Sequence, residues 1–195
     1  MRELTYFVAV SLDGFIAGPG GRLDAFPAHG DHIDALFDDY SETLPAPLLA
    51  TRGVRPSNRT FDTVIMGWNT YQVGRDHGLT SPYPHLRQLV CTRSHSDLEV
   101  PEDVEVVTND VQGRIARLKS EDASSGIWLC GGGVLAAVLF EQIDRLVLKR
   151  NPVVIGAGVP LFSGIGYAPR AFVLEDVRRF DSGVSMQRYV RATAP

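Results

Sequence analysis

The sequence predicts an α/β fold with a mostly parallel central sheet, and three observations support this prediction. Short runs of β-branched and other apolar residues alternate with segments of helical period along the 195 residues. Turns with glycine follow several of these runs, as at the strand-to-helix junctions of parallel sheets. Two β-rich segments flank the loop 181–183, which predicts an antiparallel hairpin at one edge. Because no repeat, low-complexity tract or linker divides the chain, we expect one domain over residues 1–195.

Composition narrows the class of protein. A hydrophobic content of 44% with 22% charged residues is enough for a full core. The net charge of −4 argues against nucleic acid as a partner, since such a site needs a clustered basic surface. No apolar run approaches the roughly 20 residues that span a bilayer, and the N-terminus lacks the pattern of a signal peptide. We therefore expect a cytoplasmic protein without a membrane partner.

Cysteine and histidine usage predicts no metal site. The two cysteines, Cys91 and Cys130, each lie in an apolar strand-like segment, which favours buried free thiols over a disulfide. Two cysteines cannot form a structural zinc site unaided, and the five histidines have no metal-binding spacing.

The first predicted strand covers residues 4–10, whose near-continuous apolar character indicates burial on both faces. A turn at 11–14 and a glycine-rich loop at 18–21 follow. A mobile loop directly after a central strand is well placed to cover a ligand. An ordinary surface turn explains the same glycines.

A helix is predicted over residues 31–44, where Ile33, Leu36, Phe37, Tyr40 and Leu44 form one apolar stripe. Its several carboxylates look like an acid/base site, yet most of them lie on the far side, where a solvated helix face is the simpler interpretation. Only Asp34, at a margin of the stripe, can reach a pocket. Pro45 and Pro47 are expected to end the helix, and residues 48–59 to form an irregular insertion.

The remaining elements follow from the same patterns. We expect strands over residues 63–66, 86–92, 104–108, 127–130 and 145–150, a glycine loop within 151–162, and a terminal hairpin over 171–180 and 184–192. A short helix is expected from Trp68, broken by Gly74 and Gly78. Another helix follows Asn109 or Asp110, either of which can cap it.

The stretch Ile127–Phe140 carries the strongest functional signal. Four apolar residues predict a buried strand, three glycines follow, and an apolar helix begins. Such a junction leaves free backbone N–H groups at a helix start, and glycine lets an anion approach the backbone without a side chain in the way. Phosphate or pyrophosphate is the first ligand to consider. A tight strand-to-helix turn that binds nothing is the alternative.

Three further junctions are expected at the same edge of the sheet, because ligands of such sheets lie outside the carboxyl ends of the strands. They are the loop after Val10, the segment Gly67–Thr70 and the segment Thr92–Ser94. Arg93 is either a solvated loop cation or, beside two hydroxyl residues, a bidentate phosphate ligand. Four junctions on one edge favour a ligand site over a set of plain turns.

Gly131, Gly133 and Ala136 match the dinucleotide fingerprint G-x-G-x-x-[GA]. However, the motif lies two-thirds along the chain, and no acidic residue between positions 144 and 175 is available to hold a ribose 2′-hydroxyl. Without that acid, and with Arg93 at the same edge, the pattern leans toward a 2′-phosphate and hence NADPH. A P-loop is excluded, since no Gly-Lys-Ser/Thr sequence follows a glycine loop.

Several motifs together resemble the dihydrofolate-reductase-like superfamily. They are Val10-Ser11-Leu12-Asp13-Gly14-Phe15-Ile16-Ala17, Val64-Ile65-Met66-Gly67-x-x-Thr70-Tyr71, Cys91-Thr92-Arg93-Ser94 and Trp128-Leu129-Cys130-Gly131-Gly132-Gly133, in the family's order. Within the superfamily, the chain is most similar to the branch with the C-terminal reductase domain of bacterial riboflavin biosynthesis, which the stretch 152–162 also resembles. The resemblance implies an NADPH-dependent reductase, expected as a homodimer. It also implies three layers, with helices on both faces of a mostly parallel sheet of eight or nine strands.

The resemblance further implies roles for individual residues. At the nicotinamide end of the cofactor it implies Ala9 at the ring, with Ile16 and Ala17 along the ribose in a closing loop. At the phosphates it implies Gly67 and Thr70, and around the 2′-phosphate Thr92, Arg93 and Ser94. At the pyrophosphate it implies Gly131, Gly132, Gly133, Val134 and Leu135. The substrate would lie against Leu36 and Phe37. The cofactor carries the hydride chemistry, and the protein supplies orientation and electrostatics.

Departures from the family limit the choice of substrate and of proton donor. Folate reduction is not expected, because Ile33 stands where a dihydrofolate reductase has its buried carboxylate. Trp68 stands where the family usually has an arginine, and the first strand lacks the lysine of the riboflavin-pathway enzymes.

Asp34 and Asp13 are the candidate catalytic proton donors, with solvent as an alternative. We expect a reductase of a small heterocycle or another carbonyl or imine compound; the alternative is a nucleotide-binding protein that keeps the fold without turnover.

Overall fold

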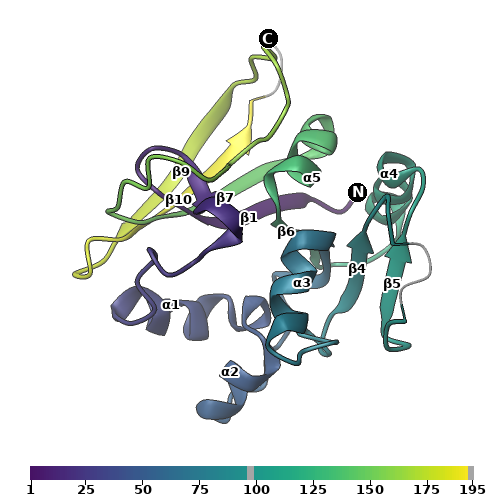
Figure 1. Ribbon diagram of the computed structural model, residues 1–195, viewed down its shortest axis with the longest axis horizontal. Helices are drawn as coiled ribbons and strands as arrows, with labels where there is room; N and C mark the ends of the chain where they lie inside the picture. Colours follow the sequence, from purple (N-terminus) through teal and green to yellow (C-terminus); the bar gives the residue numbers. More distant parts are fainter. Residues whose placement is uncertain (96–98, 193–195) are drawn as a thin grey trace.

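Eight strands form the central sheet, in the order β5-β4-β3-β6-β1-β7-β10-β9 (Figure 1). The computed structural model describes residues 1–95 and 99–192. The strands are β1 (Leu4–Val10), β3 (Phe61–Gly67), β4 (Arg87–Cys91), β5 (Val104–Val107), β6 (Gly126–Gly131), β7 (Arg145–Arg150), β9 (Phe172–Arg179) and β10 (Ser185–Arg191). All neighbours from β5 to β7 are parallel, and the hairpin β9–β10 joins β7 in antiparallel fashion. The predicted α/β fold, mostly parallel with an antiparallel edge, is confirmed.

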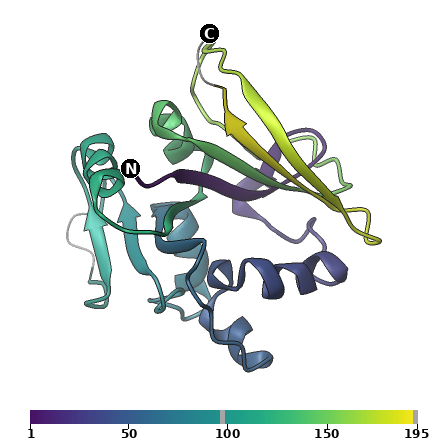
Figure 2. The ribbon, with the colours of Figure 1, turned by 180° about the vertical axis from the view of Figure 1, so that it is seen from behind.

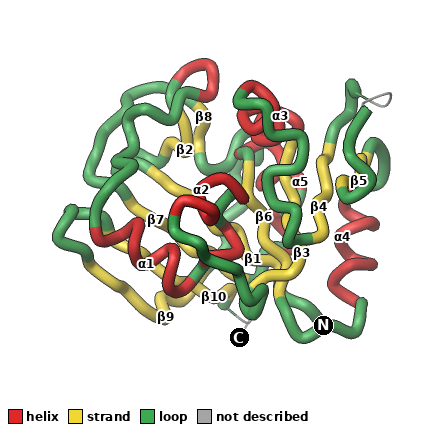
Figure 3. Tube along the Cα trace, turned by 90° about the horizontal axis from the view of Figure 1, so that it is seen from below, coloured by secondary structure: helices red, strands yellow, loops and turns green. Residues whose placement is uncertain are grey.

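Helices cover both faces of the sheet. On one face lie α1 (Asp31–Asp39), α2 (Ala46–Thr51) and α3 (Trp68–Asp76); on the other lie α4 (Val111–Ser120) and α5 (Gly133–Val138). Figure 2 shows the same layers from behind, and in Figure 3 α1 and α2 lie in front of the strands. Among the described residues no helix is long and apolar enough to cross a membrane.

The central strand β1 explains why its sequence is apolar almost throughout. Its side chains enter two hydrophobic clusters, one on each side of the sheet: Tyr6 packs in the cluster under α4 and α5, and Phe7 in the cluster under α1. Both are buried, as expected for alternate residues of a strand covered on both faces. If one face of β1 had faced solvent, its sequence would have alternated between apolar and polar residues.

Two predictions for the region after β1 are wrong. The first helix ends at Asp39 and not at Leu44, because Tyr40 leaves helical geometry at φ −140° and a 3₁₀ turn, Ser41–Thr43, follows. Pro45 and Pro47 do not simply end that helix; they begin α2. Proline is tolerated in the first turn of a helix, where its missing N–H would have no partner, and the expected irregular insertion therefore starts with a helix.

The predictions for the next two helices need smaller changes. Helix α3 runs through Gly74 and ends before Gly78, whose φ of +76° is left-handed. Of the two candidate caps for α4, Asp110 is the cap, since its carboxylate accepts the N–H of Gly113. The short 3₁₀ helix Phe140–Gln142 leads from α5 toward β7.

A small second sheet, absent from the sequence prediction, holds the loop after β1. Strand β2 (Phe15–Ala17) pairs in antiparallel fashion with β8 (Val159–Pro160). The Leu161 N–H also donates to the carbonyl of Gly14 at 2.9 Å. The first part of the predicted mobile loop is therefore anchored, and only at Pro19–Gly21 does it turn away from this sheet, as a 3₁₀ turn.

Candidate active site

The carboxyl ends of β4, β3, β6 and β1 are neighbours along one edge of the sheet. The four predicted junctions therefore follow one another in space: Thr92–Ser94, Gly67–Thr70, the glycine turn after Cys130, and the loop after Val10. Three strand spacings of about 4.8 Å separate β4 from β1, so the row spans about 14 Å. An extended ligand laid across this edge would meet all four segments.

The centre of this edge is the contact between two glycine turns. A Cβ built on Gly67 would lie 3.7 Å from the carbonyl oxygen of Gly131 and from the amide nitrogen of Gly132. Thr70, in the first turn of α3, has its hydroxyl oxygen 3.6 Å from a Cβ built on Gly132, with no other neighbour within 4 Å. The peptide bond between Gly131 and Gly132 is cis. Gly132 has open space where a side chain would lie.

The next three residues, also predicted to contact pyrophosphate, have different surroundings. A Cβ on Gly133 would lie 2.2 Å from the Pro160 carbonyl oxygen, so this glycine is required by packing against the segment 159–163 and not by a ligand. Val134 is exposed, whereas the Leu135 side chain is buried in the core below α5. Only the backbone N–H groups of these residues remain available to an anion.

The predicted 2′-phosphate site lies at the far end of the row, after β4. Thr92 is buried and its hydroxyl lies 3.2 Å from Nδ1 of His95, while it accepts the N–H of Ser94. Arg93 and Ser94 are exposed. The threonine thus shapes the turn, and the exposed arginine and serine are the groups that a phosphate can reach.

A stacked aromatic pair that the sequence did not predict lies at the same end. Trp68, in the first turn of α3, stacks on His95 with ring centroids 3.9 Å apart and planes inclined by 16°. The Arg75 guanidinium lies 5.6 Å from the tryptophan ring. Trp68 therefore presents an aromatic surface at the start of α3. No local signal linked it to a histidine 27 positions away.

The other end of the row contains the residues predicted at the nicotinamide. Ala9 is half-buried, next to the carboxyl end of β1. Ile16 and Ala17 are buried in the small sheet, and their strand lies directly against Gly158, whose added Cβ would be 2.0 Å from the Ala17 carbonyl oxygen. Both residues therefore lie in a strand and not in an open loop, and this strand contacts β1.

The predicted substrate contacts on α1 are mostly inside the core. Leu36 and Phe37 are each 7% exposed and pack against the sheet, so only a small edge of either side chain can touch a substrate. Asp34 lies on the outer side of α1, where it is exposed and pairs with Arg52 at 2.7 Å. The same guanidinium lies 4.0 Å from the Phe37 ring centroid. This placement does not support Asp34 as the proton donor.

Asp13 tethers two loops to each other. Its carboxylate accepts the hydroxyl of Ser11 at 2.6 Å and the backbone N–H groups of Ile155 and Gly156. The Ser11 hydrogen bond is the main reason that the pKa of Asp13 is lowered to about 2. A carboxylate that stays ionised at neutral pH has no proton to give, so the predicted catalytic role of Asp13 is not supported either.

Comparison with known proteins places this geometry in a family. A family model described as the RibD C-terminal domain matches residues 2–186, which is nearly the whole chain. The chain belongs to the RibD C-terminal domain family. The sequence is also 30% identical over 193 residues to the uncharacterized protein YwjB of Bacillus subtilis (strain 168), covering 98% of this chain and 99% of that protein.

Two solved structures share the fold of this family member. A putative riboflavin biosynthesis protein from Shewanella sp. PV-4 is 24% identical, with a TM-score of 0.71 over 99% of this chain and 100% of that chain. Dihydrofolate reductase from Enterococcus faecalis, complexed with NADP(H), is 19% identical, with a TM-score of 0.62 over 98% of this chain and 97% of the other. The predicted dihydrofolate-reductase-like fold is confirmed.

A lysine that the sequence prediction overlooked also lies at the carboxyl edge in this RibD C-terminal domain. Lys149 stands opposite Ala9 in the parallel pair β1–β7. It is half-buried, and desolvation by burial lowers its pKa from the ordinary 10.5. The available signal was a lysine directly after the apolar run Leu146–Leu148, the only lysine in the strands that the structure describes.

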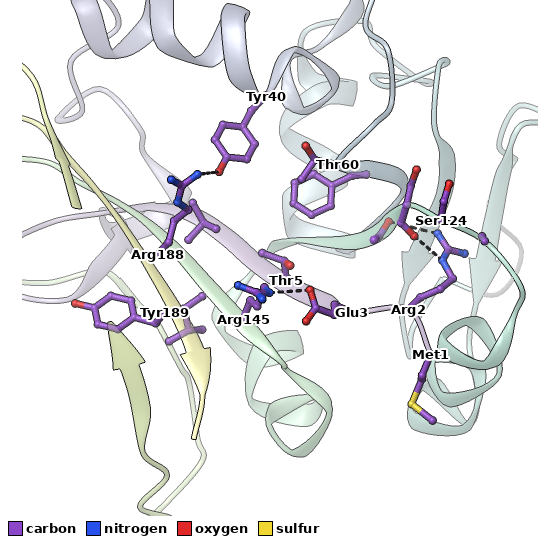
Figure 4. A pocket seen from close by; sticks show the side chains of 16 residues that line it. Met1, Arg2, Glu3, Thr5, Tyr40, Thr60, Ser124, Arg145, Arg188 and Tyr189 are labelled. Atoms are coloured by element: carbon purple, nitrogen blue, oxygen red, sulfur yellow. Dashed lines mark hydrogen bonds and ion pairs between the residues drawn. The ribbon is translucent and has the colours of Figure 1, made fainter. Parts of the chain in front are cut away.

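A cavity of about 360 Å³ lies at the opposite edge of the sheet, at the amino ends of β1, β6 and β7 (Figure 4). Two arginines that line it are already paired: Arg145 with Glu3 at 2.7 Å, and Arg188 with Asp176 at 2.9 Å. Within the described residues no group of three potential metal ligands is present here or elsewhere. These two arginines already have partners, and we place the candidate active site at the carboxyl edge.

Proposed function

We propose that the protein is an NADPH-dependent reductase that transfers a hydride to a small heterocyclic or carbonyl or imine substrate, such as a pyrimidinone or a pterin. Membership of the RibD C-terminal domain family over residues 2–186 is the observation that carries the proposal. The dihydrofolate-reductase-like fold supports it, as does the row of predicted cofactor residues along one sheet edge. We further propose a cytoplasmic homodimer with a small-molecule substrate.

Open space beside Gly132 and backbone N–H groups at two helix starts support a site for the phosphates of a dinucleotide at the carboxyl edge. A side chain at Gly132 would fill the open space beside Thr70, and no side chain in the described part of the chain caps the start of α3 or of α5. The N–H groups in the first turn of a helix have no partner within the helix, so they can donate to an anion. Gly67, Thr70 and Gly131–Leu135 are the residues that would hold the pyrophosphate.

Each end of the edge has a separate task in this proposal. The bound dihydronicotinamide supplies the hydride. The backbone of Ala9 would fix the nicotinamide end beside β1, with Ile16 and Ala17 against the ribose. Arg93 and Ser94 would hold the 2′-phosphate at the β4 end, about 14 Å away by strand spacing. The protein thereby orients the reacting ring against the substrate.

Titration with NADPH and with NADH, followed by nicotinamide fluorescence, tests the cofactor. Binding of neither dinucleotide would contradict the proposal. A panel of pterins, pyrimidinones and flavins then tests turnover. If the dinucleotide binds but no compound of the panel causes its oxidation, a nucleotide-binding protein without catalysis is favoured. This alternative stays open because Asp34 and Asp13 are both engaged in other contacts.

Gly132→Val should abolish binding of both cofactors while the protein still folds.

Arg93→Ala should weaken NADPH much more than NADH. The exposed guanidinium has the only charge in the segment Thr92–Ser94, and only NADPH carries the 2′-phosphate. Losing a charged hydrogen-bond partner costs about 1.5–3 kcal/mol, which is roughly tenfold or more in affinity. Fluorescence titrations with each cofactor measure how much affinity the variant loses for NADPH and for NADH. The matched control is Arg59→Ala, an exposed arginine outside this edge; equal losses for both cofactors in Arg93→Ala would show that another group recognises the phosphate.

A further inference from the structure

The chain contains only two lysines among its 19 basic residues. Lys119 is buried, donates to the carbonyl of Gln142 and pairs with Asp144. Lys149 differs, because among the described residues its ammonium has neither an ion pair nor a hydrogen bond, and burial alone perturbs it. An arginine keeps its proton at all relevant pH values, whereas a lysine in apolar surroundings can release one. Lysine at 149 is therefore chemically different from the arginines that dominate this protein.

The register of the sheet brings Lys149 to the candidate active site. Strand β7 lies between β1 and β10 (Figure 1). Lys149 stands opposite Ala9 on one side and Met186 on the other. Its side chain lies on the same face as that of Val147, two residues earlier, which packs in the cluster under α1. One strand spacing of about 4.8 Å thus separates the lysine from the residue proposed to meet the nicotinamide.

Among the described residues, the elements around Lys149 offer it no counter-ion. The residues of β1 nearest to it on its face are Phe7 and Ala9, and the residue of β10 opposite it is Met186. The nearby titratable and charged groups already have partners: Arg178 of β9 pairs with Asp39 of α1, Arg188 of β10 with Asp176 and the Tyr40 hydroxyl, and His32 of α1 with Ser182 and the Pro27 carbonyl. The ammonium is therefore left to interact with a ligand at the sheet edge.

We propose that Lys149 is the proton-donating residue of the reduction, an inference that rests on the proposed function. The carbon of the substrate C=O or C=N bond receives a hydride from the reduced dinucleotide, which is thereby oxidised. The π-electron pair moves onto the oxygen or nitrogen, and this atom takes a proton from the Lys149 ammonium. The lysine is left as a neutral amine and regains a proton from water. Desolvation makes its ammonium a stronger acid than that of a solvated lysine.

Nuclear magnetic resonance of ¹³C-methylated amines tests the placement without relying on activity. The chain has only three amines, at Met1, Lys119 and Lys149, so each signal is resolved and Lys149→Arg assigns its own. The Lys149 signal should titrate below the ordinary pKa of 10.5. Adding NADP⁺ should lower that pKa further than adding NADPH does, because only the oxidised nicotinamide ring is positively charged. The Lys119 signal should respond to neither.

The outcomes separate this inference from the proposed function. Cofactor binding, followed independently by fluorescence, with no change in the Lys149 signal would overturn the role of Lys149 and leave the cofactor proposal standing. Absence of binding would overturn both. A shift that NADP⁺ and NADPH produce equally would locate Lys149 away from the nicotinamide and would also overturn its role.

Turnover with any accepted substrate of the panel provides the second test. Lys149→Met should lower kcat by about 10²- to 10⁴-fold, with an affinity for NADPH within about threefold of the original. Lys149→Arg should lose kcat similarly, because it keeps the charge but cannot donate the proton. The control Arg117→Met removes an exposed cation on α4 and should leave kcat unchanged. Added methylammonium should partly restore the kcat of Lys149→Ala. An unchanged kcat in Lys149→Met would overturn the inference.

Discussion

At the scale of single residues, two adjacent glycines show how differently the fold uses one residue type. Gly132 has open space on its Cβ side, with Thr70 Oγ1 at 3.6 Å as the single neighbour within 4 Å. Gly133 has the Pro160 carbonyl oxygen at 2.2 Å and the Ser163 hydroxyl at 2.7 Å from the same built position. The first glycine leaves room for a ligand, and the second allows two segments of the chain to touch.

Gly133→Ala should therefore destabilise the protein, and Gly132→Ala should be tolerated. Forcing a methyl group against a backbone carbonyl typically costs about 1–3 kcal/mol of unfolding free energy, because the segments must move apart. Gly132→Ala should change stability by less than about 1 kcal/mol while weakening cofactor binding. Urea unfolding of both variants measures the difference. Equal stabilities would contradict the close contact at Gly133.

Asp13→Asn should reduce stability at neutral pH and lose this effect in acid. The pKa of Asp13 in the folded protein, about 2, is below its ordinary value of 3.8, because the charged form accepts hydrogen bonds from Ser11, Ile155 and Gly156. Its stabilisation is present above about pH 4 and is lost as the pH falls through 2. The stability difference between the original protein and Asp13→Asn, measured by urea unfolding, should shrink between pH 4 and pH 2. A difference that does not depend on pH would contradict this assignment.

At the scale of secondary-structure elements, the sequence predicted what local patterns determine and missed what distant contacts create. The strand Arg145–Arg150 and the terminal hairpin were predicted nearly residue for residue, because burial and turn chemistry mark them locally. Strands β2 and β8 are only three and two residues long, and their pairing joins positions about 145 apart. Helix α2 was missed because its prolines also fit a helix end.

Gly158→Ala should loosen the small sheet that holds the loop after β1. Gly158 has φ +150°, and an added Cβ would lie 2.0 Å from the Ala17 carbonyl oxygen. The matched control is Gly156→Ala, where φ is +80° and no atom lies within 4 Å, so that only the backbone conformation is penalised. Amide hydrogen exchange of Leu161, which donates to Gly14, should be faster in Gly158→Ala than in the control. The same rate in both would show that the contact with Ala17 is unimportant.

At the scale of the whole molecule, the order of the strands assembles the candidate site. Segments that are dispersed from Ala9 to Leu135 along the chain become neighbours because β3, β6 and β1 pair in parallel. The common edge was predictable from the α/β pattern, since carboxyl ends of parallel strands lie together. The surroundings of each residue on that edge were not, as the ion pair between Asp34 and Arg52 illustrates.

We expect a homodimer in solution, an expectation that comes from the family resemblance. Three apolar side chains of the edge strand β9 are exposed, Val173 at 54%, Leu174 at 50% and Val177 at 39%, and exposed apolar patches favour association. Sedimentation velocity should give twice the 21.3 kDa of the chain at micromolar concentration. A single species of 21.3 kDa would contradict the expectation.

The sequence by itself determined the fold class, the strands with strong apolar patterns and the glycine turn after Cys130. These features depend on residues that are close in the chain, where hydrophobic period and turn preferences act. Only the tertiary structure decided which groups are free to react: it pairs Asp34 with Arg52, ties Asp13 to Gly156, and leaves Lys149 beside Ala9 without a counter-ion among the described residues. The availability of a charged group depends on partners from distant segments, and strand pairing sets these partners.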